Sequence, residues 1–195
     1  VSTAMQASTV VGDAVTTYQR HAEQGRALVF VWSIEGSVAL AAAFQAAGIQ
    51  AAPVDGEPPK DERKRAMAAF RAGELRVLCN VDLFGEGLDV PAVDAVFLLR
   101  PTDSLGLYLQ QCGRGLRMSP GKQTVRIFDH VGNWTRHGLP DEDREWSLDG
   151  KPKKPQEGAP NPKRCAHCFA VSPISATACV ECGRPFPVKS RKIEH

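Results

Sequence analysis

Two arginines three residues apart are the first side chains of this sequence that could do chemistry. Arg114 and Arg117 follow Gly113 in the run Gln-Gln-Cys-Gly-Arg-Gly-Leu-Arg. On a helix, residues three apart project from the same face, and paired guanidinium groups suit the oxygens of a phosphate. A glycine beside them lets a backbone or a phosphate come close. A basic helical turn on the outside of the protein is the alternative interpretation.

A second candidate site is the glycine-rich stretch at residues 83–91, Leu-Phe-Gly-Glu-Gly-Leu-Asp-Val-Pro. Gly85 and Gly87 permit unusual backbone angles and expose N–H groups to a phosphate or a sugar. The carboxylate of Asp89 can accept a hydrogen bond from a hydroxyl group. A glycine-rich turn with Asp89 as a helix cap is the simpler alternative.

Four of the six cysteines form two Cys-x-x-Cys pairs near the C-terminus. Four thiolates at this spacing suit a zinc ion with closed tetrahedral coordination. So small a segment cannot form a hydrophobic core, so the metal would supply most of its folding free energy. We therefore expect a structural zinc ribbon of rubredoxin-like type rather than disulfides or an iron site. The predicted ligands are Cys165, Cys168, Cys179 and Cys182.

Short apolar strands alternate with helices along most of the chain. This alternation predicts βαβ units and a mostly parallel sheet flanked by helices, an α/β fold. The carboxyl ends of such strands are where ligands bind, and the loops at 33–37, 55–57, 82–89 and 100–104 fall there. The expected strands are 28–32, 49–54, 76–81, 95–99 and 124–128, and the expected helices are 13–24, 38–47, 60–72 and 105–112.

The charge of the chain is unevenly divided. The net charge is +2, but residues 151–195 hold nine Lys and Arg against three Asp and Glu, so residues 1–150 are weakly acidic. A basic tail favours contact with a polyanion, although it could simply keep the protein in solution. Because no run of eighteen apolar residues and no signal peptide is found, we expect a cytoplasmic protein without membrane contact.

Four blocks together resemble the second RecA-like lobe of superfamily 2 (DEAD/DEAH-type) helicases, from about residue 27 to about residue 129. They keep the order and spacing of that family. The blocks are Val-Phe-Val-Trp-Ser at 29–33, Asp-Gly at 55–56 with Phe-Arg-Ala-Gly at 70–73, Gly-Glu-Gly-Leu-Asp-Val-Pro at 85–91, and Gln-x-x-Gly-Arg-x-x-Arg at 110–117. The phrase Leu-Arg-Pro-Thr at 99–102 looks like the family's link into the last block.

The resemblance implies that this chain contributes to an ATP site. Arg114 and Arg117 look like arginine fingers that contact the γ-phosphate of ATP, which the first lobe holds together with magnesium. Gln110 would orient the helix or contact the nucleotide, and Gly113 would lie beside it.

The other blocks of the resemblance imply contacts to ribose and nucleic acid. Gly87 and Asp89 match the block that contacts ribose and couples ATP to nucleic acid. Ser33, Gly56 and Gly85 would lie near the nucleic-acid backbone, with backbone N–H groups as donors. Relatives often have threonine where this chain has Gly85, so a backbone contact must replace that hydroxyl.

The sequence contains no Gly-x-x-x-x-Gly-Lys-Ser/Thr loop and no Asp-Glu-x-Asp/His box. We therefore expect the C-terminal part of a larger ATP-dependent helicase or translocase, inactive as an ATPase by itself. Its expected partners are the first RecA-like lobe and nucleic acid, DNA rather than RNA. The alternative is a non-catalytic nucleic-acid-binding or docking module with a zinc ribbon.

The expected domains are the helicase lobe at 1–140, a basic, proline-rich linker at 141–164, the zinc ribbon at 165–187 and a basic tail at 188–195. The ribbon could bind nucleic acid or dock a protein. Residues 129–138 hold an aspartate and two histidines, but their spacing matches no standard metal site. We expect a polar turn packed on the lobe there, with His130 or Trp134 against nucleic acid as the alternative.

Overall fold

The computed structural model describes residues 13–22, 25–54, 60–81, 93–144, 163–168, 170–172 and 175–187. The chain divides into two compact units, Val1–Glu142 and Asp143–His195. The finer division into lobe, linker, ribbon and tail remains a prediction.

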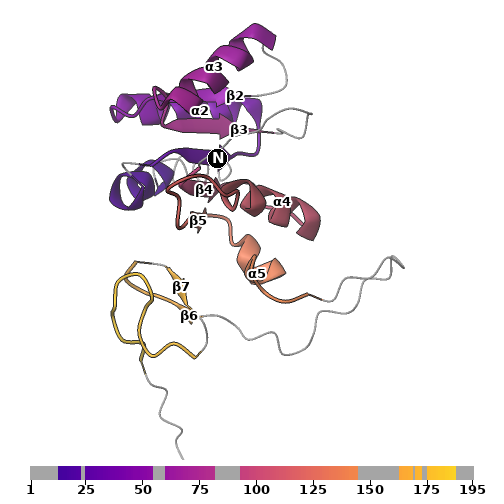
Figure 1. Cartoon of the computed structure of the whole chain (residues 1–195). Helices are drawn as coiled ribbons and strands as arrows, with labels where there is room; N and C mark the ends of the chain where they lie inside the picture. Colours follow the sequence, from indigo (N-terminus) through magenta and orange to yellow (C-terminus); the bar gives the residue numbers. More distant parts are fainter. Residues whose placement is uncertain are drawn as a thin grey trace, which may run out of the picture. The chain divides into compact units, whose positions relative to one another are not determined.

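The first unit is built on a five-stranded parallel sheet, as the α/β expectation requires (Figure 1). Neighbouring strands pair in the order β2-β3-β1-β4-β5, and their last residues pair with one another, so all five strands end along one edge. The strands are β1 (Ala27–Phe30), β2 (Ala51–Val54), β3 (Val77–Asn80), β4 (Ala95–Leu98) and β5 (Arg126–Asp129).

Helices cover both faces of this sheet, which explains why the central strands β1 and β4 are continuously apolar. Residues 13–21 and α2 (Ile34–Ala46) contribute Tyr18 and Phe44 to the core on one face. On the other face, α3 (Lys60–Ala72) and α4 (Leu105–Gly115) contribute Phe70 and Tyr108. Successive residues of each central strand face opposite cores, since side chains alternate along a strand.

The structure contains the expected strands and helices, with ends that differ by a few residues. Helix α2 begins at Ile34, earlier than expected, because the Ser33 hydroxyl oxygen accepts a hydrogen bond from the Gly36 N–H at 3.0 Å and caps it. Cys79 and Cys112 are buried in the lobe, and neither forms a disulfide. The sequence did not predict the short helix α5 (Asn133–His137).

The described part of the second unit holds little regular structure. Two short antiparallel strands, β6 (Lys163–Arg164) and β7 (Val171–Ser172), pair with each other, and an isolated bridge joins Ala178 to Pro185. This arrangement agrees with the small cysteine-rich module expected at the C-terminus. Among the described residues of both units, no helix is long and apolar enough to cross a membrane.

Candidate nucleotide and metal sites

Helix α4 carries the arginine motif, and a hydrogen-bonded loop fixes where the helix begins. The Ser104 hydroxyl oxygen accepts from the Leu107 N–H at 3.2 Å, which makes Ser104 the cap of α4. The Ser104 N–H in turn donates to the hydroxyl oxygen of Thr102 at 3.1 Å. The loop after β4 is thereby tied to the first turn of the helix.

Helix α5 holds the same loop from the other side. The Asn133 side chain accepts from the Thr102 N–H and donates to the Arg100 carbonyl, both at 3.0 Å. Further along, the Tyr108 hydroxyl donates to the Gly138 carbonyl at 3.1 Å, and its ring stacks on His137. These contacts connect the first half of α4 to α5 through buried polar groups. Sequence reasoning missed Asn133, which no periodic pattern distinguishes from a surface residue.

The carboxylate of Asp129 is engaged in holding this short helix. Its oxygens accept from the Val131 N–H at 3.1 Å and the Trp134 N–H at 2.7 Å. Burial raises the pKa of Asp129, and these backbone hydrogen bonds act in the opposite direction. Among the described residues, the only group of three or more potential ligands is the cysteine cluster. The segment at 129–138 is therefore a polar element packed on the lobe, in part a helix and not only a turn.

The two candidate finger residues differ in their backbone setting. Arg114 is half-buried in the last turn of α4, whereas Arg117 is exposed and lies beyond the end of the helix at Gly115. Helix α4 therefore carries Arg114 but not Arg117, because it ends two residues before Arg117. The position of Arg117 depends on the segment that follows α4.

The glycines of α4 also differ. Apart from the adjacent residues and the helix backbone, a β-carbon added to Gly113 would meet no described atom within 4 Å, so the space at Gly113 is open. A β-carbon on Gly115 would lie 2.6 Å from Val96 Cγ2 and 2.8 Å from Val125 Cγ2. Gly115 thus lets the end of the helix pack closely on the sheet. Sequence reasoning used Gly113 but missed the packing role of Gly115.

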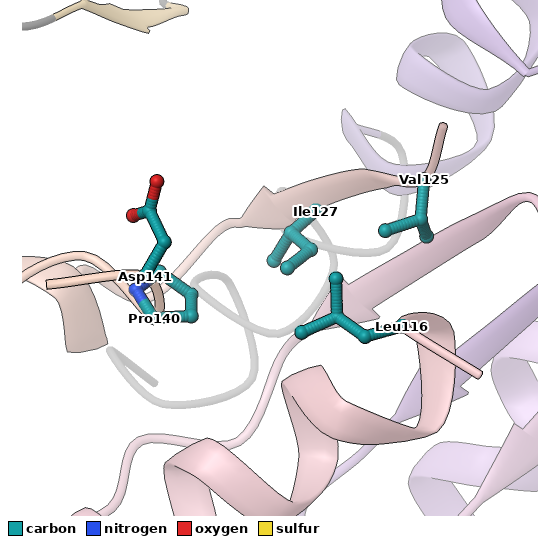
Figure 2. A pocket seen from close by; sticks show the side chains of 5 residues that line it. All are labelled: Leu116, Val125, Ile127, Pro140 and Asp141. Carbon is teal, nitrogen blue, oxygen red and sulfur yellow. The ribbon is translucent and has the colours of Figure 1, made fainter. Parts of the chain in front are cut away.

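A shallow, mostly apolar pocket borders the end of α4 (Figure 2). Leu116 extends from the end of the helix toward Val125 and Ile127, and Pro140 and Asp141 line the other side. None of these residues is predicted to contact ATP or nucleic acid. The pocket therefore lies beside the arginine motif without supplying a group to it.

The remaining predicted residues of the lobe fall into two groups. Gln110 is exposed on α4, and Ser33 lies at the carboxyl edge of the sheet, where it caps α2. Hydrogen bonds from the backbone N–H of Glu35 and from Ser33 lower the pKa of the Glu35 carboxyl group. The second group lies outside the described residues, so its roles stay predictions. That group is Gly56, Gly85, Gly87 and Asp89.

Two buried amide side chains are not among the residues predicted from the sequence. Asn80 ends β3, Gln111 follows Gln110 on α4, and each side chain is at most 1% exposed. Neither has a hydrogen-bond partner within the described part of the chain. The sequence holds a weak signal for them, since an amide is unusual inside an apolar strand or on the buried side of a helix.

The four cysteines of the second unit form a compact sulfur cluster. The Sγ atoms all lie within 4.8 Å of one another, with Cys165–Cys182 at 3.7 Å and Cys168–Cys179 at 3.5 Å. These distances suit four ligands around one ion and exceed the length of an S–S bond. Gly183 adopts a φ of 69°, which favours glycine and lets the second turn close. The donor set therefore fits a tetrahedral metal ion.

The electrostatics of the cluster also favour thiolates at two positions. Hydrogen bonds from backbone N–H groups, that of Cys182 first, lower the pKa of Cys179 to about 6. The pKa of Cys165 is lowered by the same kind of contact, chiefly with the N–H of Cys168. Burial, with hydrogen bonds from the neighbouring sulfurs, raises the pKa of Cys168 to about 12. A bound cation would favour deprotonation of all four thiols.

The family follows from the sequence of residues 9–119, which matches the model described as "Helicase conserved C-terminal domain". The chain belongs to this helicase family. It is similar to the 51.5 kDa protein of Lactococcus phage (isolate 7-9), with 42% identity over 186 residues, 94% of this chain and 41% of that protein. It is also similar to the putative ATP-dependent helicase IRC3 of Saccharomyces cerevisiae, with 38% identity over 89 residues, 46% of this chain and 13% of that protein.

Solved structures of DEAD-box proteins share the fold of this helicase lobe. The E. coli DEAD-box protein SrmB, solved bound to regulator of ribonuclease activity A, has a TM-score of 0.55 at 27% identity, covering 63% of this chain and 71% of that chain. The C-terminal domain of the DEAD-box protein Dbp5 has a TM-score of 0.56 at 22% identity, covering 67% and 74%. The expected second RecA-like lobe of a superfamily 2 helicase is confirmed. The chain spans less than half the length of the two curated relatives named above.

Proposed function

We propose that this helicase lobe supplies two arginine fingers to an ATP site shared with the first RecA-like lobe of an ATP-dependent helicase or translocase. The observation that carries the proposal is the setting of Arg114. It projects from the last turn of a helix that is capped by Ser104, tied to α5 and packed closely on the sheet at Gly115. The open space at Gly113 leaves room for a nucleotide beside it.

The chemistry of the proposed site is charge neutralisation. ATP with magnesium, held by the other lobe, supplies the phosphoryl group that is transferred to water. The guanidinium groups of Arg114 and Arg117 donate hydrogen bonds to the phosphate oxygens and stabilise the charge that develops there. In NTPases such a finger contributes about 10³–10⁵ in rate. Gln110, exposed on the same helix, orients it or contacts the nucleotide.

We further propose that the carboxyl edge of the sheet faces nucleic acid and ribose. The hydroxyl oxygen of Ser33 is engaged as a helix cap, so its contact with a phosphate uses backbone N–H groups at the start of α2. Gly56 and Gly85 act in the same way, and Gly87 with Asp89 contacts ribose. We propose DNA as the nucleic acid, with RNA as an outcome of the test below.

The cysteine cluster is proposed to hold one structural zinc ion. Its four sulfur donors leave no open position for a water or a substrate, which distinguishes a structural from a catalytic zinc site. The ligands are Cys165, Cys168, Cys179 and Cys182. Their role is to fold the second unit.

The proposal is tested in the full-length protein that carries this chain together with an ATP-binding lobe. Arg114→Ala and Arg117→Ala are expected to lower ATP turnover stimulated by nucleic acid by about 10³-fold or more, while the Kd of a fluorescent ATP analogue changes little. Arg65→Ala, on the exposed side of α3, is the matched control and should leave turnover unchanged. Unchanged turnover in Arg114→Ala would reject the finger assignment. Parallel assays with duplex DNA and with RNA decide which nucleic acid stimulates turnover.

A further inference from the structure

The segment after α4 turns back toward the end of the helix. The Lys122 N–H donates to the Ser119 carbonyl at 3.1 Å, which closes a four-residue turn with Pro120 and Gly121 at its centre. Gly121 has a φ of 79°, which glycine adopts without strain, and proline before glycine is typical of a type II turn. The turn places Lys122 beside the last residues of the helix.

The side chain of Lys122 binds two backbone carbonyls there. Its ammonium Nζ donates to the carbonyl oxygen of Gly115 and, at 3.2 Å, to that of Arg117. The last carbonyls of a helix have no N–H partner within the helix, and a cation is favoured at this end. Burial lowers the pKa of Lys122, and the charge of Asp94 opposes this effect.

The hydrogen bond to the Arg117 carbonyl extends the contact beyond the end of the helix. Gly115 is the last residue of α4, whereas Arg117 lies outside the helix and its carbonyl is not part of the helical ladder. One ammonium therefore links the packed end of the helix to the backbone of the exposed arginine. Since the adjacent side chain of Leu116 is exposed, core packing at that position does not supply this restraint.

We propose that Lys122 is a positioning residue that fixes the backbone from which Arg117 reaches its ligand. The inference rests on the proposed function, because it assumes that Arg117 meets a phosphate. Lys122 itself contacts no nucleotide and acts through the Arg117 carbonyl. A misplacement of about 1 Å in such a group can cost about 10²-fold in rate. Loss of the two hydrogen bonds from Lys122 should therefore lower ATP turnover more than it weakens ATP binding.

The test uses Lys122→Met in the full-length protein, since methionine retains an extended side chain but cannot donate a hydrogen bond. We expect kcat for ATP hydrolysis to fall by about 10- to 100-fold while KM for ATP changes by less than about twofold. Lys122→Arg, which can donate to both carbonyls, should restore most of the activity. Lys64→Met, on the exposed side of α3, is the matched control and should leave kcat unchanged.

A second readout does not depend on catalysis. Hydrogen exchange followed by mass spectrometry should show faster exchange of a peptide covering residues 114–118 in Lys122→Met, with the core strands unchanged. Lys122→Gln, which keeps an uncharged NH2 group as a hydrogen-bond donor, provides an intermediate case if the methionine variant folds poorly. Unchanged exchange in both variants would show that the hydrogen bonds of Lys122 do not restrain this backbone segment.

The outcomes separate this inference from the proposed function. If the arginine variants abolish turnover but Lys122→Met does not lower kcat, the positioning role is wrong and the fingers stand. If the arginine variants leave turnover unchanged, the finger assignment fails, and the positioning role of Lys122 fails with it. This holds even if hydrogen exchange shows that the hydrogen bonds of Lys122 restrain the backbone.

Discussion

The helicase lobe and the cysteine-rich unit are stabilised by different physics. The lobe buries apolar side chains on both faces of a five-stranded sheet. In the described part of the second unit, the buried residues are Cys165, Cys179 and Ser172, and its two paired strands have two residues each. Hydrophobic burial can therefore stabilise the folded lobe. The second unit needs another source of stability, which in our proposal is a metal ion bound by its cysteines. The difference predicts which perturbation unfolds which unit.

The largest effect is expected when the proposed zinc ion is removed from the second unit. Structural zinc contributes on the order of 10 kcal/mol to the folding of such small modules, so a chelator should remove all fixed structure there. Native mass spectrometry should show one zinc ion, lost in Cys165→Ser, and NMR should show collapse of the dispersed signals of this unit. Cys112→Ala, in the lobe, should keep the metal. A protein that binds no metal would contradict the zinc site and the contrast between the units.

Truncating a large side chain in the lobe core should destabilise the lobe and leave the second unit intact. Phe97 is fully buried on β4, with its ring centroid 4.7 Å from that of Phe128. Phe97→Ala should lower the free energy of unfolding of the lobe by about 3–5 kcal/mol, measured by urea denaturation, and leave the zinc content unchanged. A loss below about 1 kcal/mol would mean that the sheet core contributes less than its burial indicates.

Two glycines on one helix give a finer contrast within the lobe. Gly115→Ala places a β-carbon against Val96 and Val125 and should destabilise the lobe by about 1–3 kcal/mol. Gly113→Ala meets open space and should stabilise it by up to about 1 kcal/mol, because alanine favours a helix.

The same Gly113→Ala variant should lower ATP turnover in the full-length protein if a nucleotide approaches there. Thermal unfolding and ATPase assays together measure both effects. A variant that gains stability and keeps full turnover would remove Gly113 from the proposed nucleotide site.

The smallest expected effect is a pH dependence at His130. Burial lowers the pKa of this ring, which stacks on Phe97, while the charges of Asp13 and Asp129 act in the opposite direction. The unfolded chain therefore takes up the proton at a higher pH than the folded chain. Stability is complete above the ordinary pKa of about 6.5 and is lost as the pH falls through the lower folded value.

His130→Phe keeps a stacked ring but cannot be protonated. Urea denaturation at about pH 7 and about pH 5.5 should show a smaller loss of stability on acidification in the variant than in the natural protein. An equal loss in both proteins would show that His130 does not carry this dependence. The other histidines are common to both proteins and cancel in the difference.

Much of the lobe could be predicted from the sequence because its pattern is local. The apolar run at 28–32 and the periodic helix at 60–72 correspond to β1 and α3. The cysteine spacing also predicted a cluster whose sulfurs do lie together. Helix α5 was missed because five residues are too short to show periodicity. Its position depends on two hydrogen bonds: the distant Thr102 N–H donates to the Asn133 side chain, and the Trp134 N–H donates to the Asp129 carboxylate.

By itself, the sequence determined the α/β alternation, the helicase family and the cluster of four cysteines, because each is written in spacing along the chain. Only the tertiary structure decided that α4 ends before Arg117, that Gly115 packs against Val96 and Val125, and that Lys122 binds carbonyls on both sides of that end. These features depend on distances between groups that are separated in the sequence or turned back on one another. Spacing does not specify such distances, because they arise only when the sheet and its helices pack together.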